Sequence, residues 1–256
     1  MLYRSGFCSF YKTATECTWH EVRSVAFNIR MFANSRPVTS TQIAIHEHLA
    51  ALVARHSATT FRKPVQPYNR TAFDVSMQVW EAAGKPPLIL DAGCGVGLST
   101  LHLASRFPDH FVIGIDQSAH RLGRNTYWAG EPPRNAICVR ADLVDYWRLL
   151  LWAGIRPARH YVLYPNPWPK VGHLARRWHG HPVFPAIVAL GGIFECRSNW
   201  HIYINECAAA LSQLSGKPVE TAPFLPDNPI TPFEQKYLAS GHALWRCRTD
   251  LTGSSL

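Results

Sequence analysis

Five short apolar segments, separated by polar or glycine-rich turns and helical stretches, limit most strongly what this chain can fold into. They cover residues 88–92, 111–116, 137–140, 161–164 and 192–196. Helical patterns follow them, over residues 98–107, 119–127, 143–151 and about 200–214. Because a chain returns to a parallel strand through a crossover helix, this alternation predicts a mostly parallel central sheet with helices on both faces. The expected fold class is α/β.

The first 85 residues carry no comparable strand pattern. Residues 39–56 have aliphatic side chains at helical spacing, which predicts a helix capped by Ser40 or Thr41. Residues 62–70 are basic and proline-rich, which is typical of a loop or linker. We therefore expect a partly helical arm over residues 1–85 and one domain over residues 86–256. No motif assigns a role to residues 1–27.

Charge and composition exclude several classes of protein. The 256 residues carry 26 Lys and Arg against 17 Asp and Glu, a formal charge of +9, and 47% are hydrophobic. Such a chain can fill a core and is not wholly disordered. It contains no run of about 18 apolar residues, the length that a membrane-spanning helix needs. The seven cysteines form no C-x-x-C pair and the start resembles no secretory signal, so we expect a cytoplasmic protein. The positive charge favours a polyanionic partner.

The first apolar segment contains Asp91 and leads into three alternate glycines, which let the backbone turn tightly and approach a ligand. The glycines are Gly93, Gly95 and Gly97. Asp116 ends the second segment, where a carboxylate can accept hydrogen bonds from ribose hydroxyls, and Asp142 follows the third. The spacing differs from the G-x-G-x-x-G of dinucleotide sites, and the preceding acid would repel a pyrophosphate but suit a sulfonium or a ribose. The loop resembles the first motif of class I S-adenosylmethionine-dependent methyltransferases, which implies that cofactor and a Rossmann-like fold.

A rigid loop follows the fourth segment, with the sequence Pro-Asn-Pro-Trp-Pro-Lys over residues 165–170. Alternate prolines restrict the backbone, so Asn166 could hydrogen-bond a flat base at a pocket mouth and Trp168 could stack on it.

The positive charge is concentrated near this loop. No acidic residue lies between Tyr146 and Phe194, a span that includes Lys170, Arg176 and Arg177. A basic stretch beside a cofactor pocket suits a phosphate backbone. Three histidines of the span have no acid or cysteine at ligand spacing, so no metal site is expected.

The same residues resemble a known family. The 165–170 loop, with His173 and the arginine pair after it, is similar to the P-D-P-W-P-K…H…R-R signature of the tRNA (guanine-N7)-methyltransferases. Residues 36–42 resemble the family's G-R-x-T-x-x-Q, residues 191–203 its G-G-x-[FL]…T-D-W…Y, and residues 231–242 its T-x-[FY]-E…G-H. The resemblance covers residues 28–248, and it implies methyl transfer from S-adenosylmethionine to N7 of a guanine in tRNA.

The resemblance also implies roles for single residues. Asp91, Asp116 and Asp142 would contact S-adenosylmethionine, and Asn166 occupies the position of the family's catalytic Asp. The substrate-binding positions fall on Lys170, Asn199, Thr231 and Glu234, beside the phosphate contacts expected of Arg176 and Arg177. We expect a monomer or a weak homodimer.

Two departures from the family remove a carboxylate, because Asn166 and Asn199 both stand where the family has Asp. Asparagine keeps one acceptor, adds a donor and loses the charge. Losing a charge-assisted hydrogen bond would cost about 1.5–3 kcal/mol. Two alternatives follow: a methyltransferase paralogue that acts on a small molecule or another nucleic acid, and a non-catalytic RNA-binding protein.

Overall fold

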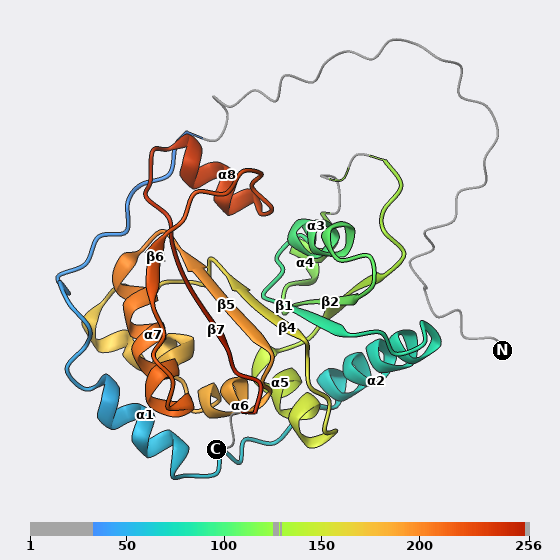
Figure 1. Ribbon diagram of the computed structural model, residues 1–256, viewed down its shortest axis with the longest axis horizontal. Helices are drawn as coiled ribbons and strands as arrows, with labels where there is room; N and C mark the ends of the chain where they lie inside the picture. Colours follow the sequence, from blue (N-terminus) through green and yellow to red (C-terminus); the bar gives the residue numbers. More distant parts are fainter. Residues whose placement is uncertain (1–32, 125–127, 129, 254–256) are drawn as a thin grey trace.

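The computed structural model describes residues 33–124, 128 and 130–253, built around a seven-stranded sheet in the order β3-β2-β1-β4-β5-β7-β6 (Figure 1). The strands are β1 (Leu88–Ala92), β2 (Phe111–Asp116), β3 (Ala136–Arg140), β4 (Arg159–Leu163), β5 (Ile193–Ser198), β6 (Thr221–Pro223) and β7 (Trp245–Asp250). Neighbouring strands from β3 to β5 are parallel, whereas β7 runs antiparallel to β5 and β6. The mostly parallel α/β sheet expected from the sequence is confirmed.

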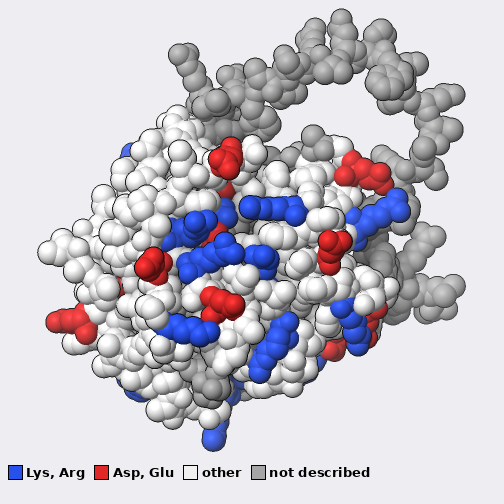
Figure 2. Space-filling model, in the orientation of Figure 1, with Lys and Arg blue, Asp and Glu red and all other residues white. Residues whose placement is uncertain are grey.

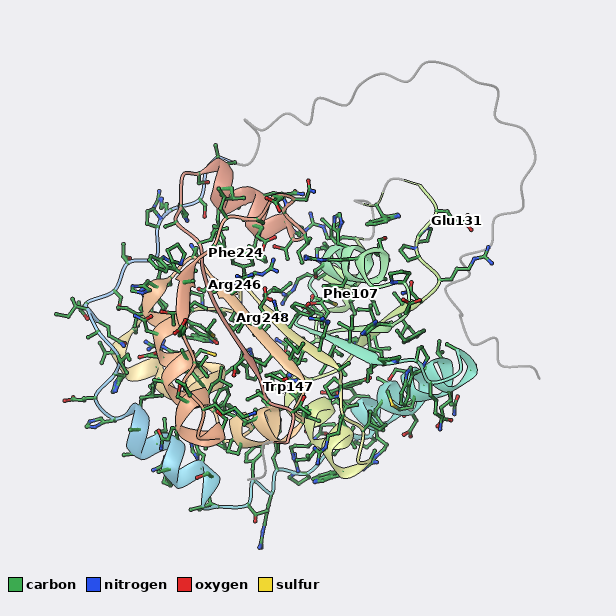
Figure 3. All side chains as sticks on the ribbon, in the orientation of Figure 1. Phe107, Glu131, Trp147, Phe224, Arg246 and Arg248 are labelled. Carbon is green, nitrogen blue, oxygen red and sulfur yellow. The ribbon has the colours of Figure 1, made fainter. Side chains whose placement is uncertain are left out.

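Alternate residues of the central strands point into two separate apolar clusters. Leu88 and Leu90 of β1 lie in the larger cluster, whereas Ile89 lies in the smaller one beside α3. Successive strand residues face opposite sides of a sheet, so helices cover both faces, as predicted. The helices of the larger cluster are α1 (Leu49–Ser57), α2 (Pro67–Ala82), α5 (Leu143–Trp152), α6 (Phe184–Ala189) and α7 (His201–Ser215). Trp147 of α5 is fully buried among them, which makes it a packing residue (Figure 3).

Within the described part of the chain, the other face carries fewer helices. They are α3 (Leu98–Arg106), α4 (Ala119–Leu122) and α8 (Pro232–Ala239). Figure 1 shows β5 and β7 below α8 and to the left of α3, with no described helix in front of them. Two short 3-10 helices, η2 (Val171–Arg176) and η3 (Trp178–Gly180), follow the proline-rich loop.

The five strands expected from the sequence lie within two residues of their predicted bounds. Helix α4 ends at Leu122, earlier than the predicted 127, and residues 125–127 lie outside the described part. The sequence reading missed α6, α8, β6 and β7. Strand β7 lacks an apolar run because only Cys247 is buried in its middle. Within the described residues, no helix is both long and apolar enough to cross a membrane.

Two expectations for the N-terminal region are wrong. Helix α1 begins at Leu49, not near residue 39, because the Ser40 hydroxyl binds a loop carbonyl and the Gln42 amide binds Glu206, so neither starts a helix. Helix α2 begins at Pro67, inside the expected loop, since a proline suits the first turn of a helix. Both helices bury their apolar sides against the sheet's larger cluster. The unassigned residues 1–27 lie outside the described part.

Candidate active site

A cavity of about 480 Å³ opens where β1, β2 and β4 end and the chain after β3 begins α5. Ligands bind at this carboxyl edge in open α/β sheets because the connecting loops part there. The cavity brings together six of the residues singled out from the sequence. They are Gly93, Asp116, Asp142, Asn166, Trp168 and Arg176.

Asp116 is the best-placed acceptor on the cofactor side of the cavity. Its side chain is almost wholly buried, and its two oxygens accept hydrogen bonds from Ser118 N at 2.8 Å and Gly95 N at 3.1 Å. Arg121 Nη1 lies 3.2 Å from Oδ2 and partly covers it from solvent. Each carboxylate oxygen has a further lone pair, so a ribose hydroxyl can still donate to this group.

The glycine loop contributes Gly93 to the cavity wall. Gly93 lines the cavity with φ +85°, a conformation that other residues rarely adopt. Its amide and that of Cys94 both donate to Ile115 O, at 2.8 and 3.0 Å, which ties the loop to β2. At Gly97, which precedes α3, a Cβ atom would lie 3.0 Å from Cys138 Sγ. Gly95 and Gly97 therefore shape the loop without lining the cavity.

Asp91 and Asp142 hold helix ends. Asp91 Oδ2 accepts hydrogen bonds from Ser99 Oγ at 2.6 Å and Thr100 Oγ1 at 2.7 Å, and burial raises the pKa of this carboxyl to about 6. Asp91 does not line the cavity, so its geometry supports a link between β1 and α3 rather than the cofactor contact that the resemblance implied. Asp142 lines the cavity while its Oδ1 caps α5 by accepting from Val144 N at 2.9 Å.

The proline-rich loop forms the opposite wall. Asn166 is exposed at the cavity, and its Oδ1 accepts a hydrogen bond from Trp168 N at 3.3 Å. Tyr164 and Trp168 both have positive φ angles, +51° and +46°, on either side of Asn166. The Arg176 guanidinium lies over the Trp168 ring at 4.9 Å. Backbone strain of this kind often accompanies functional loops.

The cations of the acid-free span do not form one surface. Arg148 is buried beside Asp145 at 3.5 Å, and Arg177 is fully buried against Glu206 at 2.5 Å. The phosphate contact expected of Arg177 does not fit this burial. Lys170 and Arg176 are exposed, and of these Arg176 lines the cavity.

Thr231 and Glu234 cap the start of α8 in a pattern close to a capping box, with Ile230 N in place of the N-cap amide. Thr231 Oγ1 accepts from Glu234 N at 2.9 Å, and the Glu234 carboxylate accepts from Ile230 N at 2.8 Å. The same carboxylate lies 2.7 Å from Arg197 Nη1 and accepts from the Tyr164 hydroxyl at 2.9 Å. Thr231 and Glu234 are buried, so their geometry supports a structural role rather than the substrate contact that the resemblance implied.

Asn199 joins two parts of the chain outside the cavity. Its Nδ2 lies 3.1 Å from His242 Nδ1, and His242 Nε2 lies 3.1 Å from Ser35 O. Asn199 and His242, both in segments that resemble the family, therefore lie side by side. Their hydrogen bonds join the N-terminal segment to the C-terminal part of the chain, outside the cavity.

Several side chains that line the cavity had no role assigned from the sequence, among them Arg121, His181 and Phe233. Phe233 lies between Thr231 and Glu234, so the T-x-F-E motif was a signal for it. Arg121 and His181 have no such signal, because only the fold brings α4 and the chain after η3 to this edge.

Comparison with known proteins agrees with this picture. A family model described as "Putative methyltransferase" matches residues 85–247. The chain belongs to this methyltransferase family. A tRNA (guanine-N(7)-)-methyltransferase of Burkholderia vietnamiensis is 27% identical over 190 residues, which cover 71% of this chain and 72% of that protein. One of Ralstonia pickettii is 28% identical over 186 residues, which cover 70% and 71%.

Solved structures resemble the chain more distantly. An antibiotic-related methyltransferase has a TM-score of 0.49 and 17% identity, and covers 75% of this chain and 96% of its own. A 16S rRNA (adenine(1408)-N(1))-methyltransferase from Catenulisporales acidiphilia has a TM-score of 0.47 and 18% identity, and covers 67% and 88%.

The family match and the order of the strands in the sheet identify the protein as a class I S-adenosylmethionine-dependent methyltransferase, as the glycine loop predicted. The residues at the cavity fit this cosubstrate. Asp116 offers acceptors for ribose hydroxyls, and Gly93 leaves room for close approach of a ligand. Asp142 adds a second carboxylate to the cavity wall, and its Oδ2 lies 3.4 Å from Lys63 Nζ.

Proposed function

We propose that this enzyme methylates N7 of a guanine in tRNA. One observation carries the proposal: a single cavity is lined by the cofactor edge around Asp116 and by the Asn166–Trp168 loop. A methyl donor and a flat base can therefore meet in it. The names of the curated relatives support the same reaction.

The reaction requires the protein mainly to position the methyl donor and the guanine base. S-adenosylmethionine supplies a methyl group on a sulfonium, and guanine N7 carries a free lone pair at neutral pH, so no proton has to be removed first. Asn166 can accept from or donate to the edge of the base, and Trp168 offers a ring for stacking. Holding the two reactants in line supplies most of the rate enhancement in such a reaction.

The surface around the cavity suits a phosphate backbone. Lys170 and Arg176 are exposed beside the loop. On the face shown in Figure 2, Lys and Arg side chains gather over β7, where Arg246 and Arg248 lie (Figure 3). Neither arginine has an ion pair within the described residues, and Arg246 lies over the Phe224 ring at 4.8 Å. Such unpaired cations can bind phosphates.

We further infer that the enzyme works in the cytoplasm as a monomer or weak homodimer. The first inference follows from a tRNA substrate. The second can be checked by light scattering of the purified chain over a range of concentrations.

One assay separates this proposal from its alternatives. Purified enzyme is incubated with labelled S-adenosylmethionine and unmodified tRNA, and 7-methylguanosine is mapped by borohydride reduction and aniline cleavage. Transfer to a guanine N7 supports the proposal. Cofactor binding without transfer to tRNA would indicate the paralogue with another substrate, and tRNA binding without cofactor binding would indicate the non-catalytic protein.

Asn166→Asp is the companion variant. If the base is held as in the family, the restored carboxylate strengthens a hydrogen bond by about 1.5–3 kcal/mol, and kcat rises. A fall in kcat would show that asparagine suits the substrate of this enzyme.

A further inference from the structure

Residues 33–48 run along the outside of the domain without helix or strand and meet the proline-rich loop. Their central contact is Gln42, whose Nε2 donates to Glu206 Oε1 of α7 at 2.6 Å. The backbone amide of His46 donates to the same oxygen at 3.0 Å, and the Ser40 hydroxyl donates to Pro169 O. One short stretch of chain thus binds both α7 and the loop.

Arg177 connects these contacts to the loop itself. Its Nη2 donates to Gln42 Oε1 at 2.9 Å and its Nη1 to Glu206 Oε2 at 2.5 Å. Its Nε and Nη2 also donate to the carbonyls of Trp168 and Lys170, at 3.2 and 3.3 Å. The guanidinium therefore uses one plane of donors to join the N-terminal segment, α7 and the loop.

The network is buried and charged. Arg177, Glu206 and His179 have side chains with no solvent exposure, and His179 Nε2 lies 2.8 Å from Glu206 Oε2. Burial alone would raise the pKa of Glu206, but the hydrogen bonds from His179 and Arg177 lower it to about 2. Glu206 is thus ionised at neutral pH. Removing one partner of a buried ion pair is costly, so this arrangement resists distortion.

The loop needs such support because of its backbone. Tyr164 and Trp168 have φ angles of +51° and +46°, and non-glycine residues in this region carry about 1–3 kcal/mol of strain each. Strain of this size persists only where surrounding contacts fix the conformation. At Trp168, the bond from Arg177 Nε to the carbonyl is such a contact.

We propose that Gln42 and Glu206 are positioning residues, which act through Arg177 to hold the Asn166–Trp168 wall of the cavity in its reactive shape. This inference rests on the proposed function for its activity readout, but not for its structural one. It gives a role to Gln42, the last residue of the 36–42 segment that resembles the family. It also explains why Arg177 is buried near a loop that is expected to face RNA.

The test compares Gln42→Met, which keeps the length of the side chain and removes its amide, with Gln213→Ala. Gln213 Nε2 donates to Ala50 O at 2.9 Å, so the control also removes an amide bond between α7 and the N-terminal region, away from the loop. Gln42→Met is expected to lower kcat about 10–100-fold, the effect of misplacing reactants by about an ångström. Affinity for S-adenosylmethionine stays within about twofold, and Gln213→Ala changes neither quantity.

Hydrogen–deuterium exchange gives a readout that does not depend on the reaction. Amides of residues 168–176 exchange faster in Gln42→Met and remain at the wild-type rate in Gln213→Ala. The double variant Gln42→Glu/Glu206→Gln, which exchanges the amide and the carboxylate, recovers part of the protection. Should Gln42→Met fail to fold, Ser40→Ala is used instead, with the same changes at smaller size.

Unchanged loop exchange in Gln42→Met would overturn the inference, as would an equal loss of kcat in the Gln213→Ala control. If the wild-type enzyme does not methylate tRNA, the proposed function fails. The exchange experiment still decides whether Gln42 holds the loop.

Discussion

Replacing Glu234 distinguishes two roles for the T-x-F-E motif, a substrate contact and a structural cap. The carboxylate is fully buried, lies 2.7 Å from Arg197 and accepts from Ile230 N at 2.8 Å. Breaking a buried ion pair costs about 3–5 kcal/mol, and the low end applies because Arg197 keeps Glu195 at 2.7 Å. The lost amide bond adds about 1 kcal/mol. Glu234→Ala should therefore cost about 4 kcal/mol.

Thermal unfolding followed by circular dichroism measures this loss. For a chain of this size, 1 kcal/mol lowers Tm by about 2–4 °C, so Glu234→Ala lowers it by about 8–16 °C. Thr231→Ala, which removes only the cap, costs about 1 kcal/mol and lowers Tm by about 2–4 °C. Phe233→Ala is the contrasting variant, because its ring is half exposed at the cavity; it leaves Tm almost unchanged while lowering activity. An unchanged Tm in Glu234→Ala, with a raised KM for tRNA, would refute the structural role.

Three further variants test the cofactor edge, the core and the basic face. Asp116→Asn should weaken S-adenosylmethionine binding about 10–100-fold by calorimetry, since a charge-assisted hydrogen bond contributes about 1.5–3 kcal/mol; equal affinity would contradict the assignment. Burial lowers the pKa of His160 from 6.5 to about 3, so the unfolded chain takes up a proton below pH 6.5 that the folded chain does not. The free energy of unfolding therefore decreases as the pH is lowered below 6.5, and this group accounts for a loss of about 2 kcal/mol at pH 5. Urea unfolding of His160→Gln should lack that loss, and equal pH dependence in both proteins would contradict the reasoning. Arg248→Gln should reduce the slope of log affinity for tRNA against log salt by about 1, while Arg55→Gln, on a helix of the other face, should not. Equal slopes for the two variants would remove β7 from the tRNA surface.

The sequence predicted the central sheet well because its signal is local. Each buried parallel strand is a short apolar run, and the glycine loop marks the end of β1. Strands β6 and β7 have no such run, because one face of this edge remains polar, and the helix expected near residue 39 does not form since its polar groups bind distant partners.

The candidate site was only partly predictable, for a related reason. Residue types indicated which side chains could bind a ribose, a base or a phosphate, and Asp116, Asn166 and Arg176 do line one cavity. Residue types do not reveal which cations find a buried partner. Arg176 and Arg177 are neighbours in the chain, yet one lies exposed over Trp168 and the other is buried against Glu206.

The sequence by itself therefore determined the α/β class and the five parallel strand segments, because turns and apolar runs are set by neighbouring residues. Only the tertiary structure decided which polar groups serve the ligand and which serve the fold. Glu206 lies far along the chain from Gln42, and Glu234 from Tyr164, and a hydrogen bond between such residues exists only once the sheet has brought them together. Burial then fixes their role, because a charge without water must keep the partner that neutralises it.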